Sequence, residues 1–175
     1  ADYTSFVDTI KRRFPAYAIF NLNYRLSATP NNLFPTQELD VKEAIEFIYS
    51  KANEYRISNK YVLLGASAGA HLAMLHGYKY NVPIKAKAVV SFFGPSDLTE
   101  MYNNPSYSAA LAAAVGTTPV LNPTLYFNSS PINFITSSGA VPTILIHGGL
   151  DPLVSPSHSV SVQTKLSALS IANQF

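Results

Sequence analysis

The sequence predicts an α/β domain in which a mostly parallel sheet carries helices on both faces. Two observations support this class. Short apolar runs alternate along the chain with segments in which apolar residues recur at helical spacing, and this order is typical of βαβ units. The 175 residues are 47% hydrophobic and 13% charged, which is enough apolar material for one core. We therefore expect residues 1–175 to form a single domain or part of one.

Four strands and three main helices follow from these patterns. The expected strands are "YAIFNLNY" at 17–24 behind the Pro15 breaker, "YVLLG" at 61–65, "AKAVVSFF" at 86–93 and "TILIH" at 143–147. The expected helices cover 36–55, 67–78 and 156–169. Residues 101–139 are rich in Pro, Asn and Ser, interrupted by the Ala-rich "SAALAAAV". We interpret them as a helical and loop excursion over the active site.

The charge and the cysteine content exclude some classes of partner and of binding site. The net charge is only +2, and the densest basic cluster, Lys11-Arg12-Arg13, fits a solvated helix end, so nucleic acid is not expected as a partner. The chain has no cysteine, which excludes disulfides and thiolate metal sites but leaves the compartment undecided. No apolar stretch approaches the ~20 residues of a membrane span. Because Ala1 is not an initiator Met, the lack of a signal peptide at this end does not identify the compartment.

The stretch Gly65-Ala66-Ser67-Ala68-Gly69 has GxSxG spacing and falls between an expected strand and an expected helix. That context is typical of a nucleophile elbow, a sharp turn that strains the serine backbone and projects Oγ at the carboxyl edge of a sheet. The N–H of Ala68, at the start of the helix, is the natural oxyanion donor. The alternative is a packing turn where a strand meets a helix closely. The strand–turn–helix context favours Ser67 as a nucleophile.

A serine nucleophile needs a base, and the base needs an acid to orient it. Asp151, in "TILIHGGLDPLV", lies just beyond the last of the expected strands on a Gly-rich loop. Asp97, in "FFGPSDL", is the competing acid, although it also fits a helix cap before Leu98. We expect Asp151 to be the acid.

None of the four histidines fits the role of the base. His71 and His76 lie on the helix after Ser67, pointing along it or away from it. We expect His147, at a strand end, to brace the acid loop by hydrogen bonding. His158 lies near the start of the last helix, where we expect it to be exposed.

Five segments follow one another in an order that resembles the esterase/lipase branch of the α/β-hydrolase superfamily, which includes hormone-sensitive-lipase-like and feruloyl-esterase-like carboxylesterases. They are "NLNYRL" at 21–26, "FPTQELDVKEAIEFI" at 34–48, "GASAGAHLA" at 65–73, "FFGPSDL" at 92–98 and "PTILIHGGLDPLV" at 142–154. The resemblance implies an α/β-hydrolase fold and a carboxylesterase that cleaves small or aryl esters through an acyl-enzyme. It also implies Ser67 as nucleophile, Asp151 as acid, and no metal or organic cofactor.

Two parts of the family pattern do not occur in these residues. The family's base is a histidine on a loop some tens of residues beyond the acid, after one more strand. Its main oxyanion loop, of "HGG" type, follows a strand that precedes the helix expected at 3–14. That strand would lie between 17–24 and 61–65, so the expected sheet has a gap at its centre. We therefore expect an internal segment of a larger hydrolase, with the base and the second oxyanion donor outside it, or else an unusual closure of the gap.

Other functions remain open. Arylformamidases carry very similar "SAGAHLA" elbows, and related peptidases share the fold. A different class is a catalytically inactive hydrolase-fold fragment or a binding module. The sequence leaves acyl specificity and oligomeric state undetermined.

Two further expectations concern particular side chains. Tyr102, Tyr126 and Phe127, on the excursion, are candidate substrate-binding residues, with ordinary core aromatics as the alternative. Arg25, at a strand end, and Asp40, near the start of a helix, are candidates for a buried or half-buried ion pair that fixes the loop between them.

Overall fold

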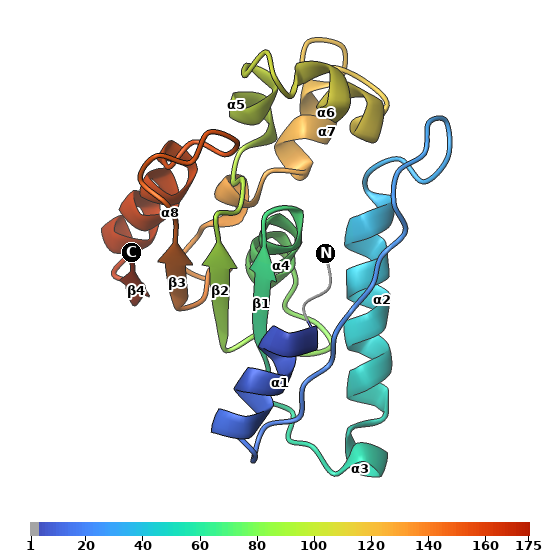
Figure 1. The fold of residues 1–175 in the computed structure, drawn as a ribbon, viewed down its shortest axis with the longest axis vertical. Coiled ribbons are helices and arrows are strands. Elements are labelled where there is room, and N and C mark those ends of the chain that lie inside the picture. The colour runs from blue at the N-terminus through green and yellow to red at the C-terminus, as the bar shows by residue number, and fades with distance from the viewer. Residues whose placement is uncertain (1–3) are drawn as a thin grey trace.

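A parallel four-stranded sheet forms the centre of the computed structural model, which describes residues 4–175 (Figure 1). The strands are β1 (Val62–Ala66), β2 (Ala88–Phe92), β3 (Thr143–Ile146) and β4 (Asn173–Gln174), in the order β1-β2-β3-β4. The helices are α1 (Thr4–Arg13), α2 (Thr36–Ser50), α3 (Ala52–Tyr55), α4 (Ala68–Lys79), α5 (Leu98–Tyr102), α6 (Ser108–Val115), α7 (Pro123–Asn128), the 3₁₀ helix η1 (Pro131–Phe134) and α8 (Ser157–Ala168). Most of the expected elements are confirmed, and the very short β4 was not predicted.

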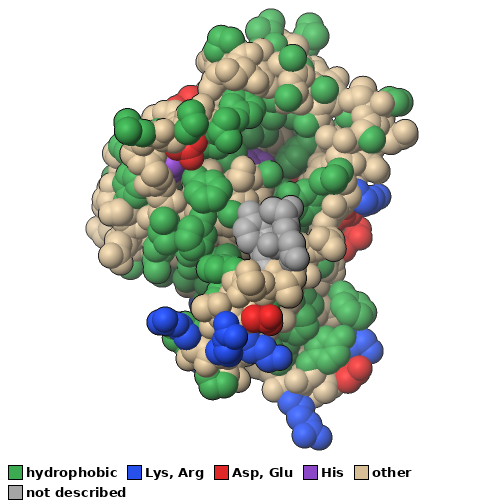
Figure 2. Space-filling view, in the orientation of Figure 1, with side chains coloured by type: hydrophobic (Ala, Val, Ile, Leu, Met, Phe, Trp, Pro, Cys, Tyr) green, Lys and Arg blue, Asp and Glu red, His purple; other side chains and the backbone are tan. Residues whose placement is uncertain are grey.

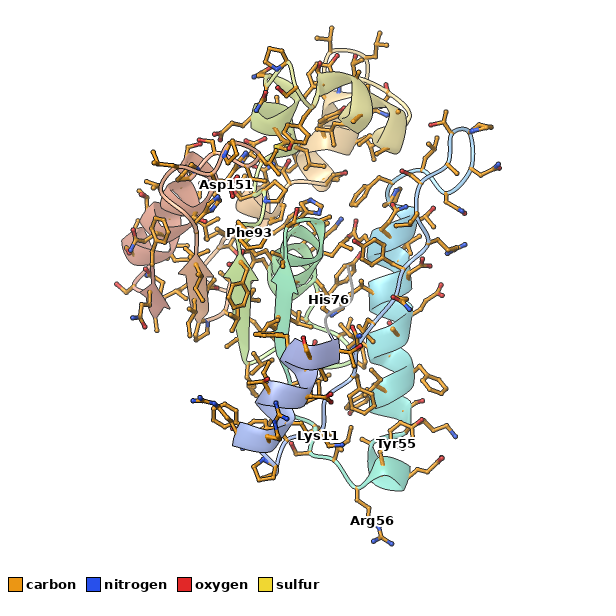
Figure 3. The ribbon with its side chains drawn as sticks, in the orientation of Figure 1. Lys11, Tyr55, Arg56, His76, Phe93 and Asp151 are labelled. Atoms are coloured by element: carbon orange, nitrogen blue, oxygen red, sulfur yellow. The ribbon has the colours of Figure 1, made fainter. Side chains whose placement is uncertain are left out.

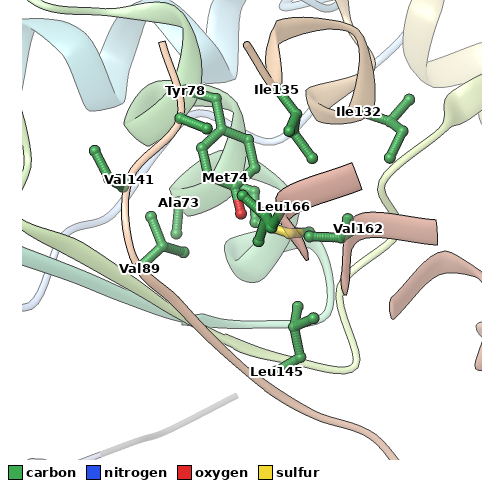
Figure 4. Close-up of a cluster of buried hydrophobic side chains, with 11 residues drawn as sticks. Ala73, Met74, Tyr78, Val89, Ile132, Ile135, Val141, Leu145, Val162 and Leu166 are labelled. Carbon is green, nitrogen blue, oxygen red and sulfur yellow. The ribbon is translucent and has the colours of Figure 1, made fainter. Parts of the chain in front are cut away.

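The main core lies between the sheet and the helices α4 and α8. Residues 70–78 of α4 are all buried, which explains why this helix shows no polar face. Val162 and Leu166 of α8 are fully buried in the same cluster, against Val89 of β2 (Figure 4). Burying a side chain of this size contributes roughly 1.5–3 kcal/mol relative to leaving it exposed. The helices therefore fix one face of the sheet firmly.

The opposite face of the sheet is only partly covered by the described residues. The strand register places Leu64, Val90 and Ile144 side by side on this face. Leu64 is 45% exposed and Ile144 is 43% exposed. Helix α1 reaches the face through Phe6, whose ring lies edge-on to that of Phe92 with centroids 6.1 Å apart. Figure 2 shows hydrophobic side chains gathered there. The predicted covering of both faces is thus extensive on one face and partial on the other.

Residues 17–24 do not form the strand that the sequence predicted. They run as an extended, mostly exposed segment beside α2, outside the sheet (Figure 1). A strand needs a neighbour for its N–H and C=O groups, and no described strand lies beyond β1 to accept this one. The segment instead leaves a shallow hollow of about 350 Å³ against α2, lined by residues that include Ile19, Leu22 and Phe47. Because 17–24 stays out of the sheet, the expected central gap does not arise.

Residues 98–134 contain four short helices, α5, α6, α7 and η1, and overlap the range 101–139 in which the sequence predicted a helical and loop excursion. They lie beyond the carboxyl ends of the strands (Figure 1), with a small core of their own around Leu98, Val115 and Tyr126. The excursion is tied to the loop before α2 by two hydrogen bonds. The Thr29 hydroxyl donates to the carbonyl of Ala113 at 2.9 Å, and the Phe34 N–H donates to that of Ala114 at 2.9 Å.

Arg25 and Asp40 form the ion pair that the sequence suggested. The Arg25 Nε donates to Asp40 Oδ1 at 3.0 Å, and the Arg25 backbone N–H donates to Oδ2 at 2.8 Å. The side chain of Arg25 is 57% exposed and that of Asp40 is 13% exposed, so the pair is half-buried. Hydrogen bonds from Arg25 hold the pKa of Asp40 below its usual value. Gln37 adds a second tie, because its Nε2 donates to the carbonyl of Arg25 at 2.9 Å.

A buried acidic residue joins α2 to the end of α4. Glu38 is 3% exposed, and its Oε1 accepts hydrogen bonds from the Tyr80 hydroxyl at 2.7 Å and from Lys79 Nζ at 2.7 Å. Lys79 Nζ also donates to the carbonyl of Asn128, so this one carboxylate helps connect α2, α4 and the excursion. Removing an acceptor of this kind leaves its donors without a partner. The free-energy cost of a buried donor without a partner exceeds the net stabilisation that one hydrogen bond provides.

We predict that Arg25→Ala lowers the melting temperature slightly at pH 7, because an ion pair with an exposed guanidinium contributes only modestly to the stability of the fold. The pKa of Asp40 is depressed in the folded state, so the stabilisation is present above its unfolded value of about 4 and is lost as the pH falls through the folded value. The difference between wild type and variant should therefore shrink as the pH falls below the unfolded pKa of Asp40 and through its lower folded value. Lys87→Ala, at an exposed position, is the control for loss of a cation. An unchanged melting temperature in Arg25→Ala at pH 7 would contradict the role of the pair.

Glu38→Ala should destabilise the fold by about 1–3 kcal/mol, measured by urea unfolding, because it leaves the Tyr80 hydroxyl and the Lys79 ammonium without their shared acceptor. Glu43→Ala, at an exposed position of the same helix, should change the free energy of unfolding by less than about 0.5 kcal/mol. Equal effects of the two substitutions would show that the buried carboxylate does not connect the helices.

Candidate active site

Ser67 stands alone between the end of β1 and the start of α4, in a backbone conformation with φ 52° and ψ −123°. A positive φ is uncommon for a residue with a side chain and costs about 1–3 kcal/mol. Serine at the start of a helix usually caps it, but the Ser67 side chain makes no capping hydrogen bond to α4. The residue is also exposed. Capping thus fails to explain an exposed serine in a strained turn, whereas the predicted nucleophile elbow has this conformation.

Close packing explains why the turn begins with a glycine. A Cβ atom added to Gly65 would lie 2.2 Å from the carbonyl oxygen of Gly69 and 2.6 Å from the amide nitrogen of Ala70, both of them backbone atoms that cannot move aside. A Cβ on Gly69 itself would meet no described atom within 4 Å. Packing therefore requires glycine at the first position of the GxSxG motif and not at the second.

Hydrogen bonds hold the elbow in place on both sides. The Ser67 N–H donates to the carbonyl of Phe92 on β2 at 2.9 Å, which continues the sheet by one residue. The Ser67 carbonyl accepts from the N–H groups of Ala70 and His71 at 2.9 and 3.0 Å and so opens α4. Ala68 is the first residue of this helix, where N–H groups lack intrahelical acceptors and carry partial positive charge.

Asp151 lies on the loop after β3, at the same edge of the sheet (Figure 3). Its Oδ1 accepts hydrogen bonds from the N–H groups of Leu153 at 2.8 Å and Val154 at 3.0 Å. These two bonds hold the pKa of Asp151 below its usual value, so the carboxylate is ionised at neutral pH. Two strand spacings of about 4.8 Å separate the ends of β1 and β3, which places the two strand ends roughly 10 Å apart.

His147 braces the acid loop, as the sequence predicted. Its Nε2 donates to the carbonyl of Val154 at 2.9 Å and lies 3.5 Å from Asp151 Oδ2, while Nδ1 accepts from the Ser159 hydroxyl at 2.8 Å. This assignment follows from the groups that the ring contacts, because a carbonyl can only accept. Both ring nitrogens are engaged and the side chain has no exposed surface.

His158 is buried, which corrects the prediction that it is exposed. It is 2% exposed because the first turn of α8 packs against the loop before α5, where the Ser96 N–H donates to its Nδ1 at 3.3 Å. Burial lowers the pKa of His158, although the nearby carboxylates of Glu100 and Asp97 oppose this shift. Local sequence carries no signal for this contact, since the two segments are about 60 residues apart.

The two histidines of α4 are interior residues. Burial lowers the pKa of each to about 4, so both are neutral at pH 7. The Nε2 of His71 donates to the carbonyl of Ser129 at 2.7 Å, and the Nε2 of His76 lies 3.4 Å from the Tyr61 hydroxyl. In residues 4–175, every histidine side chain is thus engaged with a group other than Ser67.

Asp97 has the capping role that was its alternative interpretation. Its side chain accepts hydrogen bonds from the N–H groups of Thr99 at 2.8 Å and Glu100 at 3.1 Å, at the start of α5. The Asp97 carboxylate thus caps the start of α5.

The candidate substrate-binding aromatics differ in position. Tyr126 is fully buried and its hydroxyl donates to the carbonyl of Thr117 at 3.0 Å, so it is a core residue of the excursion with no surface for a substrate. This agrees with the alternative interpretation as a core aromatic. Tyr102 packs edge-on against Tyr126, with ring centroids 5.9 Å apart. Phe127 is 54% exposed and remains a candidate.

Sequence reasoning missed one strained residue at this edge of the sheet. Phe93 directly follows β2, has φ 42° and lies with Asp151 at the carboxyl edge of the sheet (Figure 3). The following Gly94-Pro95 predicted the end of the strand. It gave no sign of the positive φ at Phe93.

Residues 4–175 contain no group of three or more His, Asp or Glu side chains placed to hold a metal ion. None of the helices in this range is both long enough and apolar enough to cross a membrane.

Comparisons with curated proteins find esterases of Mycobacterium tuberculosis. A probable carboxylic ester hydrolase, LipM, is 31% identical over 147 residues, which are 76% of this chain and 33% of that protein. The esterase LipQ is 29% identical over 152 residues, or 79% of this chain and 35% of that protein. The chain thus spans about a third of the length of these relatives.

Solved structures show the same fold. A truncated form of a carbohydrate esterase from gut microbiota superposes with a TM-score of 0.77 at 27% identity, over 89% of this chain and 63% of that one. An acetyl ester-xyloside bifunctional hydrolase from Caldicellulosiruptor lactoaceticus superposes with a TM-score of 0.72 at 26% identity, over 87% of this chain and 57% of that one. The fold is therefore that of the α/β-hydrolase esterases, as the sequence predicted.

The BD-FAE family model matches residues 2–166, which is nearly the whole chain. This α/β-hydrolase chain belongs to the BD-FAE esterase family.

Proposed function

We propose that the protein is a serine carboxylesterase that cleaves small or aryl carboxylic esters through an acyl-enzyme. The observation that carries the proposal is Ser67, exposed and without a capping bond at φ 52° between β1 and α4. The named activities of LipM and LipQ support it. In this proposal the partner is a small-molecule ester, and neither nucleic acid nor a cofactor takes part.

The proposed reaction has two halves. Ser67 Oγ attacks the acyl carbon while its proton passes to a histidine base, and the N–H of Ala68 donates to the oxyanion that forms. The carbon–oxygen bond to the alcohol then breaks, and the alcohol leaves with the proton from the histidine. Water attacks the acyl-enzyme by the same route, which releases the acid and restores the Ser67 hydroxyl.

Asp151 orients the histidine in this scheme and stabilises its charged form. Its Oδ1 is occupied by two backbone N–H groups, and Oδ2 is the oxygen available to the imidazole. Since all four histidines of the chain hold other groups, we propose that the base and the second oxyanion donor come from residues outside these 175. The same engagement of the histidines favours a second candidate function, an inactive protein with a hydrolase fold.

The first experiment is covalent labelling of the full-length protein with a fluorophosphonate. We expect one label, absent in Ser67→Ala, and a loss of at least about 1,000-fold in the hydrolysis of 4-nitrophenyl acetate by that variant. Ser170→Ala is the matched control, because Ser170 is also exposed and also has a positive φ, of 55°. A folded wild-type protein that resists the label would support the inactive alternative.

A second prediction concerns the acid. Asp151→Asn keeps an oxygen that accepts from Leu153 and Val154, so the loop should hold, yet kcat/KM should fall by about 1,000- to 10,000-fold because the amide cannot orient the base correctly. Asp97→Asn, which preserves a helix cap, should change kcat/KM by less than about twofold. The reverse order of effects would assign the acid to Asp97.

The pH profile offers a related check. The pKa of Asp151 lies below its ordinary value of about 4, so Asp151 stays ionised above that pH. A fall of kcat/KM between about pH 7 and pH 5 should therefore follow protonation of the base. In Asp151→Asn, kcat/KM should still fall between about pH 7 and pH 5, but its value should be lower than that of the wild type at every pH.

A further inference from the structure

Phe93 occupies a strained position beside the proposed nucleophile. It follows the last residue of β2, and its N–H donates to the carbonyl of Ile146 on β3 at 2.8 Å. The carbonyl of Phe92, immediately before it, accepts from the Ser67 N–H at 2.9 Å. Phe93 is thus held between the Ser67 turn and the end of β3, at the carboxyl edge of the sheet (Figure 3).

The packing of Gly94 accounts for the strain. Gly94 is buried against α4 so closely that an added Cβ would lie 2.6 Å from the Ala70 Cβ and 2.9 Å from the Met74 Cε. To reach this contact directly after β2, the backbone turns at Phe93, which takes φ 42°. An aromatic residue rarely adopts this conformation, and glycine would adopt it without strain.

This turn also redirects the phenyl ring. Consecutive side chains of a regular strand point to opposite faces, so the rings of Phe92 and Phe93 would point apart. Instead their centroids are 6.5 Å apart, at an interplanar angle of 68°. The ring of Phe93 therefore lies near that of Phe92 and not on the opposite face of the sheet, and the residue is 36% exposed. A strained backbone holds a partly exposed aromatic surface next to Ser67.

We propose that Phe93 is a specificity-determining residue, whose ring forms a wall of the acyl pocket and favours flat acyl groups over compact ones. This inference rests on the proposed esterase function. A flat acyl group bound to Ser67 Oγ can lie against the phenyl ring and bury apolar surface that an acetyl group lacks. Strained backbone of this kind is concentrated at functional sites, and a purely structural role does not call for phenylalanine where glycine fits better.

The test compares acyl groups in the full-length protein, with a constant leaving group. For Phe93→Leu, the ratio of kcat/KM for 4-nitrophenyl benzoate to that for 4-nitrophenyl acetate should fall at least about tenfold, because leucine keeps apolar volume but has no flat face. Phe6→Leu is the matched control, since Phe6 is 38% exposed and lies on α1. In this control the ratio should change by less than about twofold.

Phe93→Gly separates selectivity from folding. It removes the strain at φ 42°, so we expect the melting temperature to be unchanged or higher while the selectivity ratio falls as in Phe93→Leu. If Phe93→Leu and Phe93→Gly retain the wild-type ratio and still react with the fluorophosphonate, the inference is wrong and the proposed function stands. If the folded wild-type protein does not react with that label, both fail together.

Discussion

The close approach of α4 to the carboxyl ends of β1 and β2 is the constraint on which the rest of the structure depends. Two glycines permit it, because a Cβ on Gly65 or Gly94 would lie within 2.6 Å of an atom of α4. In each case a nearby residue with a side chain takes a positive φ, Ser67 after β1 and Phe93 after β2. The strained serine and the strained phenylalanine therefore result from one packing arrangement.

The core supplies the energy that keeps these strained residues in place. Each unfavourable φ costs about 1–3 kcal/mol. Against this, Met74, Leu75 and Tyr78 of α4 are almost completely buried, and each contributes roughly 1.5–3 kcal/mol by burial. The hydroxyl of Tyr78 also pairs with that of Thr143 on β3 at 2.9 Å, so a hydrogen bond joins α4 to β3. The helix is secured along its length, and its first turn cannot relax without disturbing that core.

Local patterns predicted the elements whose partners lie within the described chain, and failed where a distant partner decides the outcome. The runs around Val62, Val89 and Ile144 became strands because each has a neighbour in the sheet. Residues 17–24 have equally apolar sequence, but they lie outside the sheet because no described strand lies beyond β1. The burial of His158 and the strain at Phe93 were missed because both come from tertiary packing, against Ser96 and through Gly94 respectively.

The proposed nucleophile, Ser67, and the proposed acid, Asp151, are positioned by separate local interactions. Ser67 is held by strand-to-helix packing, whereas Asp151 is held by the N–H groups of Leu153 and Val154 in its own loop, with His147 bracing that loop from inside. The two strand ends that carry them are separated by β2, a distance of roughly 10 Å. An imidazole with a hydrogen bond on each side bridges a distance of that order. In the proposed reaction, a base that bridges Ser67 and Asp151 therefore approaches across the end of β2.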